Sequence, residues 1–343
     1  MTFGVIVATR GCFSSALAQR GREQLLEQIK KAGHRAVVLP VEATPTGAVE
    51  TVADARKCAD LFDQHRKEID GIIVSLPNFG DELGVINTLQ WAKLGVAVLV
   101  QASADELDKL DTARRRDSFC GKIAMCNNLR QYGISWTDTA THTVAIDSPA
   151  FTADLEHFGA VCRVTRRLCQ ARIGAIGTRP AAFQTMRVSE KLLQAAGITI
   201  VPVDLSEIMA GATKLNFKSA RAQQKLLEMK GYGVVAPGIT NLEAKFEKQV
   251  RLLLACEDWM QANAIDAAGF QCWNSIQQNY GCSACLTMSM LSDQLLPFAC
   301  EVDVMGVAAM YALVLALPSH REQSNVGLCA YFMAELGVLS YMQ

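Results

Sequence analysis

Short apolar runs alternate with longer amphipathic stretches along the first 155 residues of the chain. The apolar runs predict strands at Phe3–Ala8, Ala36–Pro40, Gly71–Leu76 and Val96–Gln101. The longer stretches predict helices, notably Ser14–Ala32 and Val49–Glu68. Uniformly apolar strands separated by helices are typical of a parallel sheet, so we expect a doubly wound α/β domain over residues 1–155.

The same alternation returns after a helical linker at Phe151–Cys169. Strands are predicted at Arg172–Ile176, Ile198–Val203, Gly233–Ala236 and Ile265–Cys272, and helices at Phe183–Ala196 and Asn241–Asn263. We therefore expect a second doubly wound parallel-sheet domain over residues 156–303. Residues 304–343 are assigned to a C-terminal region, and the apolar run Val304–Leu317 in it is too short to cross a bilayer and predicts a buried helix.

The amino-acid composition argues against several classes of function for this chain. Half of the 343 residues are hydrophobic and the formal net charge is −1, which argues against a nucleic-acid groove and against a basic membrane-binding patch. Of the twelve cysteines, only Cys282 and Cys285 form a C-x-x-C pair, and a core role for that pair is favoured over zinc or redox chemistry. No signal peptide is expected at the start of the chain, and free thiols fit a cytoplasmic protein.

Polar residues follow several of the predicted strands. In the first domain these are Arg10, residues 78–82 (NFGDE) and Gln101. Ligands of doubly wound sheets bind outside the carboxyl ends of the strands, so these residues are candidates for binding.

Gly174 and Gly177 lack the G-x-G-x-x-G spacing of a dinucleotide site. A nucleotide-dependent oxidoreductase would therefore rest on fold analogy alone and ranks last.

Three consecutive arginines, Arg114 to Arg116, precede a predicted helix. They could form a clamp for phosphate or carboxylate groups. We favour a solvated surface on which they pair with nearby acids, which are Asp105, Glu106, Asp108 and Asp111.

The most informative stretch runs from Ile265 to Tyr311. It contains a strand ending at Gln271 and Trp273, a helix rich in Ser, Cys and Met, and a short apolar run that ends in Glu301 and Asp303. A carboxylate at an apolar strand end, followed by the small residues of a helix start, is typical of the active-site edge of an α/β sheet.

Five stretches in this order give the chain a family resemblance. They are LPNFGDE (76–82), RRRDSFCGKIAMCNNLRQYGI (114–134), IGAIGTRPAAFQTMRVSEKLLQAAGI (173–198), FQCWNSIQ (270–277) and PFACEVDVMGVAAMYAL (297–313). Together they resemble the L-fucose isomerase and L-arabinose isomerase superfamily, in particular its shorter fucose-isomerase-like bacterial members. The resemblance implies two α/β domains followed by a third, mostly β domain. It also implies a homo-oligomer, trimeric or hexameric, that converts an aldose into its ketose through an enediol.

The resemblance further implies a divalent metal, usually Mn²⁺. Glu301 corresponds to the first metal-binding glutamate of the family and is predicted to be both metal ligand and acid/base catalyst, with Asp303 as a second catalytic carboxylate. Where the family has a D-W-N-N type segment and later a histidine ligand, this chain has Ser324, Asn325 and Val326. We therefore expect that residues 317–343 are altered or truncated, that the third domain is largely missing, and that the metal site lacks ligands.

Three further residues are candidates for substrate binding. Arg10 resembles an arginine that contacts sugar in family members, where a neighbouring subunit's first domain completes the site, and a surface arginine is the alternative. Gln271 and Trp273 could contact sugar hydroxyls and a ring face, and the alternative is a core Trp beside a capping Gln.

Two hypotheses follow. The first is a metal-dependent aldose–ketose isomerase acting on a monosaccharide, with neither nucleic acid nor membrane as a partner. The second is a non-catalytic sugar-binding module, since two doubly wound domains are also how many sugar-binding proteins are built.

Overall fold

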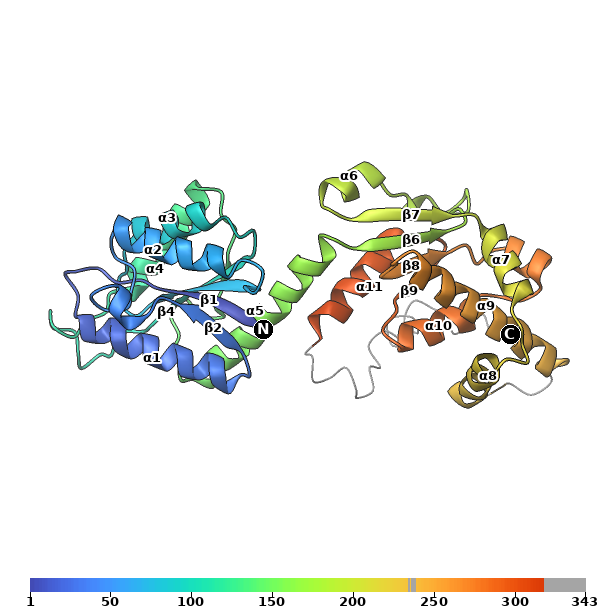
Figure 1. Ribbon diagram of the computed structural model, residues 1–343, viewed down its shortest axis with the longest axis horizontal. Coiled ribbons are helices and arrows are strands. Elements are labelled where there is room, and N and C mark those ends of the chain that lie inside the picture. Colours follow the sequence, from blue (N-terminus) through green and yellow to red (C-terminus); the bar gives the residue numbers. More distant parts are fainter. Residues whose placement is uncertain (234, 236–238, 318–343) are drawn as a thin grey trace. The chain divides into compact units, whose positions relative to one another are not determined.

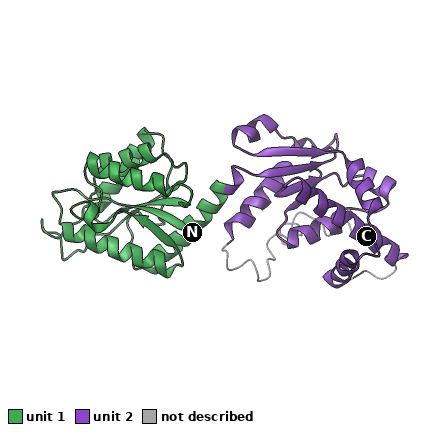
Figure 2. Ribbon diagram, in the orientation of Figure 1, with its two compact units in different colours: residues 1–166 green, residues 167–343 purple. Residues whose placement is uncertain are grey.

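The computed structural model describes residues 1–233, 235 and 239–317. The chain divides into two compact units, Met1–Arg166 and Arg167–Gln343 (Figure 2). Each unit contains one wholly parallel sheet covered by helices, which confirms the predicted fold class of two parallel α/β domains. The boundary predicted after residue 155 lies inside helix α5 (Pro149–Leu168). Two predictions fall partly outside the described residues: the strand Gly233–Ala236, of which 234 and 236 are not described, and the alteration expected at 317–343, of which 318–343 are not described.

The sheet of unit 1 has the strand order β2-β1-β3-β4-β5. Its strands are β1 (Thr2–Val7), β2 (Arg35–Val38), β3 (Gly71–Leu76), β4 (Ala97–Ala102) and β5 (Thr137–Asp138). Every residue of β1 and β3 is buried, as their uniformly apolar sequences require.

Helices cover both faces of this sheet (Figure 1). They are α1 (Ser15–Lys31), α2 (Val52–Gln64), α3 (Glu82–Ala92), α4 (Ser118–Gln131) and α5, with a 3-10 turn at Val41–Ala43. One hydrophobic core joins α1 and α5 to side chains such as Val5, Ile73 and Leu99. The other core joins α2, α3 and α4 to the opposite face of the same strands. Helices α1 and α3 therefore leave β1 and β3 on opposite faces of the sheet.

The sheet of unit 2 has the order β7-β6-β8-β9. Its strands are β6 (Arg172–Ile176), β7 (Thr199–Val203), β8 (Ala267–Phe270) and β9 (Phe298–Cys300). Its helices are α6 (Glu190–Ala195), α7 (Leu205–Lys214), α8 (Ala220–Tyr232), α9 (Leu242–Ala262), α10 (Cys285–Asp293) and α11 (Val304–Ala316), with a 3-10 turn at Gln184–Met186 and a π-helical turn at Ile276–Tyr280.

The predicted helix Phe183–Ala196 is wrong over its first half. Helix α6 begins only at Glu190, because the Ser189 side chain caps it by accepting a hydrogen bond from the backbone N–H of Leu192. Before this point the guanidinium of Arg179 donates to the carbonyl oxygens of Pro180 and Phe183, which holds the segment in a loop.

The buried helix predicted after residue 304 is confirmed. Helix α11 contacts β6, β8 and β9, and its buried residues include Val307 and Tyr311. Among the helices that the structure describes, none combines the length and the apolar character that a membrane crossing requires.

Candidate functional site

Each sheet has one point at which the strand order reverses. In unit 1 this point lies between β1 and β3, and in unit 2 it lies between β6 and β8. The connections that leave two such strands run to opposite sides, so a crevice opens beyond their carboxyl ends. The predicted site residues all follow β1, β8 or β9 and lie at this edge of their own sheet.

Arg10 follows β1 and is held by two neighbours. Its Nη2 donates a hydrogen bond to Glu82 Oε1 at 3.2 Å, and its guanidinium carbon lies 4.4 Å from the centre of the Phe79 ring. The side chains of Arg10 and Glu82 are 35% and 27% exposed, so the pair is open to solvent. An arginine has five N–H donors. The contact with Glu82 uses one of them, which leaves donors for a ligand.

Glu82 is the last residue of the polar run 78–82, which the sequence predicted as a binding candidate after β3. Its second oxygen, Oε2, accepts a hydrogen bond of 2.7 Å from Asn128 Nδ2 on α4. Glu82 therefore links the loop after β1 to α4 and has both oxygens occupied. Its position after an apolar strand is visible in the sequence, but its pairing with Arg10 is not, because that pairing depends on β1 and β3 being neighbours in the sheet.

Asn78 ties the two strand ends of unit 1 together. Its Nδ2 donates to Thr9 Oγ1 at 2.9 Å, and its Oδ1 accepts from the Gly80 N–H at 3.1 Å. The side chain is fully buried. Gln101 is likewise fully satisfied, because it accepts from Ser75 Oγ at 2.7 Å and donates to the Val144 carbonyl at 3.0 Å. Both amides therefore stabilise the edge of the sheet.

Each arginine of the triplet forms an ion pair with a nearby acid, although the partner of Arg115 is not one of the four predicted acids. Arg114 pairs with Asp111, Arg115 with Asp117, and Arg116 with Glu106.

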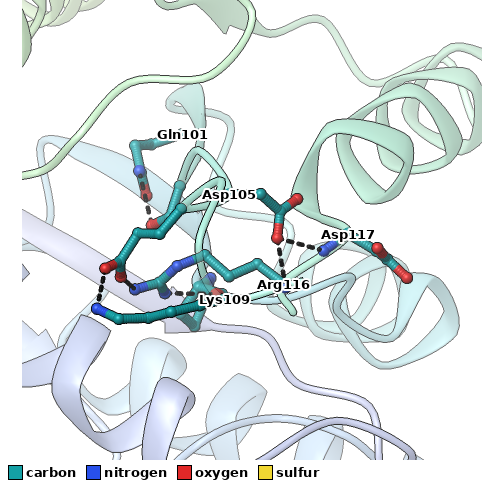
Figure 3. A network of polar contacts seen from close by, with 8 residues as sticks. Gln101, Asp105, Lys109, Arg116 and Asp117 are labelled. Atoms are coloured by element: carbon teal, nitrogen blue, oxygen red, sulfur yellow. Dashed lines mark hydrogen bonds and ion pairs between the residues drawn. The ribbon is translucent and has the colours of Figure 1, made fainter. Parts of the chain in front are cut away.

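Arg116 departs from the prediction, because it is 8% exposed and donates to the Pro77 carbonyl at 2.9 Å. Its backbone N–H also donates to Asp105 at 2.6 Å (Figure 3). Arg116 therefore supports the loop after β3 and is not part of a solvated surface.

In unit 2, Gln271 joins the ends of β6 and β8. Its Oε1 accepts from the Thr178 N–H at 2.9 Å, and its own N–H donates to the Ile176 carbonyl at 2.9 Å. Gly177 between them has φ +80°, and a Cβ there would lie 2.3 Å from Gln271 Oε1. Only glycine accommodates both the left-handed backbone and this close approach.

Glu301 follows β9, and its two carboxylate oxygens have different environments. Oε1 accepts a hydrogen bond from the indole N–H of Trp273, which follows the neighbouring strand β8. Oε2 is buried and has no hydrogen-bond partner among the described residues. A buried, unpaired carboxylate oxygen is costly, so it marks a place where a ligand would be favourable.

The backbone that carries Glu301 is unusual. Glu301 and Val302 have φ values of 64° and 55°, in the left-handed region that β-branched residues rarely adopt. The turn is held by hydrogen bonds from the Val302 N–H to the Phe270 carbonyl and from the Asp303 N–H to the Cys300 carbonyl. Two such residues in sequence cost on the order of 1–3 kcal/mol each. Strain of this kind is found where a side chain must be aimed.

Asp303 is the N-cap of α11. Its Oδ1 accepts from the Gly306 N–H at 2.8 Å, which satisfies a free donor of the first helical turn. Glu301 and Asp303 are thus both next to the edge of the sheet, but one oxygen of Asp303 is committed to the helix.

The thiols of Cys272 and Cys300 lie beside this turn. A hydrogen bond from Cys300 lowers the pKa of the Cys272 thiol, and the same contact raises the pKa of Cys300. Burial raises the pKa of Cys282 to about 12 and also raises that of Cys285. All four cysteines are free. Burial therefore disfavours the thiolate form of the C-x-x-C pair, which is the form that acts as a nucleophile or a metal ligand.

The residues present meet the requirement for a metal site only in part. Among the described ranges, no group of three or more His, Cys, Asp or Glu side chains lies together as a metal site. Among the predicted site residues, Glu301 provides a buried carboxylate oxygen without a partner, Oε2, which has the character of a ligand for a hard divalent cation. The described residues thus provide one ligand and not a complete set.

Comparison with known proteins finds a family model that matches essentially unit 1 and relatives whose similarity extends beyond it. Residues 4–169 match the model of the fucose/sulfoquinovose isomerase N-terminal domain. A sulfoquinovose isomerase of Clostridium sp. (strain MSTE9) is 28% identical over 200 residues, which cover 57% of this chain and 43% of that protein.

A second relative is similar along most of the chain. The sulfoquinovose isomerase of Priestia aryabhattai is 22% identical over 305 residues, which cover 89% of this chain and 64% of that protein. This chain therefore covers less than two thirds of the length of either relative.

Proposed function

Because this chain belongs to the fucose-isomerase-like family, we propose that it interconverts an aldose and its ketose, with Glu301 at the reacting end of the sugar. The observation that carries the proposal is the buried oxygen Oε2 of Glu301, which lacks a partner among the described residues and follows a strand at the carboxyl edge of a parallel sheet. Aldose–ketose isomerisation needs a base at the carbon that loses its proton.

The roles proposed for the side chains follow from their environments. Glu301 Oε2 would take the proton from C2 of the aldose while O1 gains a proton, which gives an enediol; it would then return the proton to C1 as O2 loses its own proton, which gives the ketose. Asp303 is the second catalytic candidate and would act through the oxygen that does not cap α11. Arg10 would donate hydrogen bonds to sugar oxygens, and Gln271 and Trp273 are the candidates for sugar contacts in unit 2.

We extend the proposal to Mn²⁺ or another divalent cation, with Glu301 as one of its ligands. When bound, such a cation stabilises the negative oxygens of an enediolate. The remaining ligands are not provided by the described residues. The substrate is proposed to be a monosaccharide, with sulfoquinovose and fucose tested first because the relatives and the family model carry those names. We also propose that the chain forms a homo-oligomer, either a trimer or a hexamer. Sedimentation measures this oligomeric state.

The test is an isomerase assay on the purified chain with Mn²⁺ against sulfoquinovose, 6-deoxyhexoses including fucose, and pentoses. Conversion of one of them is expected, and Glu301→Gln should reduce its rate by about 10²–10⁴-fold, the usual contribution of a general acid/base. Glu243→Gln is the matched control, since Glu243 forms an exposed ion pair with Lys230 in the same unit. Conversion of none of these sugars would count against catalysis by this chain.

A second candidate function has one specific observation in its favour, the incomplete ligand set in the described ranges. A non-catalytic sugar-binding module needs hydrogen-bond donors, such as those of Arg10 in unit 1 or of Gln271 in unit 2, but no cation. It predicts that a sugar raises the melting temperature without Mn²⁺ and without turnover. If no sugar of the panel shifts the melting temperature, the module is excluded for that panel.

A further inference from the structure

We propose that Trp273 is a positioning residue for Glu301: its indole N–H fixes one carboxylate oxygen and thereby presents the other to the ligand. This inference rests on the proposed function, because it assumes that Glu301 acts on a cation or a sugar. In this role Trp273 orients Glu301, whereas the proposed function considers Trp273 as a contact for the sugar.

The first step is the hydrogen bond itself. An indole N–H can only donate a hydrogen bond, and an ionised carboxylate can only accept one. Trp273 Nε1 is therefore the donor and Glu301 Oε1 the acceptor. It is charge-assisted, and such bonds are about twice as strong as those between neutral groups. The two residues follow adjacent strands, since Phe270 of β8 pairs with Cys300 of β9. The sheet register therefore brings donor and acceptor together.

The second step is the rigidity of the donor. A tryptophan side chain has two rotatable torsions, and the ring of Trp273 packs edge-on against Phe183 with centroids 5.7 Å apart. Trp273 is 39% exposed, so this contact restrains the indole on one side while its N–H faces the carboxylate. A donor held in this way sets the rotation of the carboxylate and so the direction of Oε2.

The third step is what the arrangement costs in the absence of a ligand. Oε2 is buried without a hydrogen-bond partner among the described residues, and the backbone of Glu301 and Val302 is in the left-handed region. Both features are unfavourable for folding. The unpaired oxygen and the left-handed backbone both involve Glu301. Both are explained if Oε2 must be held at a fixed place for a ligand.

The two roles of Trp273 are separated by Trp273→Phe. Phenylalanine keeps an aromatic face for a sugar and a ring to pack against Phe183, but it has no N–H. A positioning role predicts a fall in kcat with little change in the sugar KM. A sugar-platform role predicts little change in either quantity for this variant and a raised KM only for Trp273→Ala.

The contact can be observed without any metal. The chain has four tryptophans, Trp91, Trp136, Trp259 and Trp273, so the ¹H–¹⁵N spectrum of indole groups has four signals, and Trp273→Phe identifies one of them. We expect Glu301→Ala to shift that signal in the direction of a lost hydrogen bond and to leave the Trp91 signal, which comes from unit 1, unchanged. An unmoved Trp273 signal would overturn the positioning role.

The consequence for the ligand is measured by titrating Mn²⁺ calorimetrically into the wild type, Trp273→Phe and Trp91→Phe. Loss of a residue that orients a metal ligand weakens metal binding by about 10–100-fold, so this is the expected effect of Trp273→Phe. Trp91→Phe is the matched control, because Trp91 lies under Arg56 in unit 1 and should leave the affinity unchanged. Equal affinities of the wild type and Trp273→Phe would overturn the inference. If the wild type binds no Mn²⁺, the metal part of the proposed function fails, and the indole signal alone decides the positioning role.

Discussion

The guanidinium carbon of Arg10 lies 4.4 Å from the centre of the Phe79 ring, and the two residues follow the two strands between which the sheet of unit 1 reverses its order. A cation over an aromatic face is stabilised by about 0.5–1 kcal/mol at an exposed site. Together with the ion pair to Glu82, this contact restrains a side chain that would otherwise be free to move in solvent.

The first prediction concerns this restraint. Glu82→Gln removes the charge and leaves one acceptor oxygen where the carboxylate serves both Arg10 and Asn128, so the guanidinium is held less firmly. We expect the sugar KM to rise about 2–5-fold, which corresponds to an exposed pair worth up to about 1 kcal/mol, while the melting temperature stays nearly unchanged. Glu68→Gln is the control, since Glu68 pairs with Arg35 elsewhere in unit 1. A KM equal to that of the wild type would show that the Glu82 charge does not position Arg10.

The second prediction concerns the backbone behind Phe79. A Cβ at Gly121 would lie 2.1 Å from the Phe79 carbonyl oxygen, so α4 and the loop after β3 must separate in Gly121→Ala. We expect a loss of about 1–3 kcal/mol in the free energy of unfolding, as for other overpacked sites.

The matched control is a glycine whose replacement by alanine should raise the free energy of unfolding. Gly231 lies in α8, and a Cβ there meets nothing within 4 Å. Gly231→Ala should therefore stabilise unit 2 by about 0.5–1 kcal/mol through helix propensity. Urea denaturation measures both variants, and equal stability of Gly121→Ala and the wild type would contradict the predicted clash.

Most of the fold could be predicted because its signal is local. The predicted strands Gly71–Leu76 and Arg172–Ile176 have the bounds of β3 and β6, since a buried parallel strand is a continuous apolar run. The helix predicted from Phe183 failed, because contacts of Arg179 and the cap at Ser189 decide where α6 begins. Such side-chain hydrogen bonds leave no periodic trace in the sequence.

Single residues of the site could be predicted from the sequence, but the contacts between them could not. Glu301 could be chosen because a carboxylate after an apolar run is visible in the sequence. Its contact with Trp273 could not, because that contact requires β8 and β9 to be neighbours in the sheet. The capping role of Asp303 had a sequence signal that was not used, namely an Asp directly before a helical stretch. The catalytic and metal-binding roles of Glu301 and Asp303 stay predictions.

The third prediction concerns acid stability. Burial lowers the pKa of His34, and the nearby N-terminal amine and Arg163 lower it further, although Asp70 acts in the opposite direction. The unfolded chain therefore binds more protons than the folded chain between the lowered pKa and about 6.5. Stability from this group is full above pH 6.5 and is lost as the pH falls through that window.

His34→Gln isolates this effect, because glutamine does not titrate. We expect the wild type to lose more stability than the variant between pH 7.5 and pH 5.5, with a difference in slope below one proton since His34 is only half buried. Urea midpoints at the two pH values give the comparison. Parallel pH profiles of the two proteins would show that His34 is not the group responsible.

The fourth prediction concerns an ammonium group beneath the surface of unit 1. The Lys122 side chain is fully buried, whereas its partner Asp138 is 54% exposed. Lys122 Nζ donates to Thr139 Oγ1 at 2.8 Å and lies 2.5 Å from Asp138 Oδ1. Asp138→Ala leaves the buried charge with the Thr139 hydroxyl alone, so we expect a loss of about 1–3 kcal/mol in the free energy of unfolding.

Asp111→Ala is the surface control for this variant, because its partner Arg114 is well exposed and the pair should contribute less than about 1 kcal/mol. Lys122→Met separates charge from volume. It removes the ammonium but fills the same apolar space, so it should cost less than Lys122→Ala, which also leaves a cavity. If Asp138→Ala and Asp111→Ala have the same effect in urea denaturation, water reaches the Lys122 ammonium and the pair behaves as a surface ion pair.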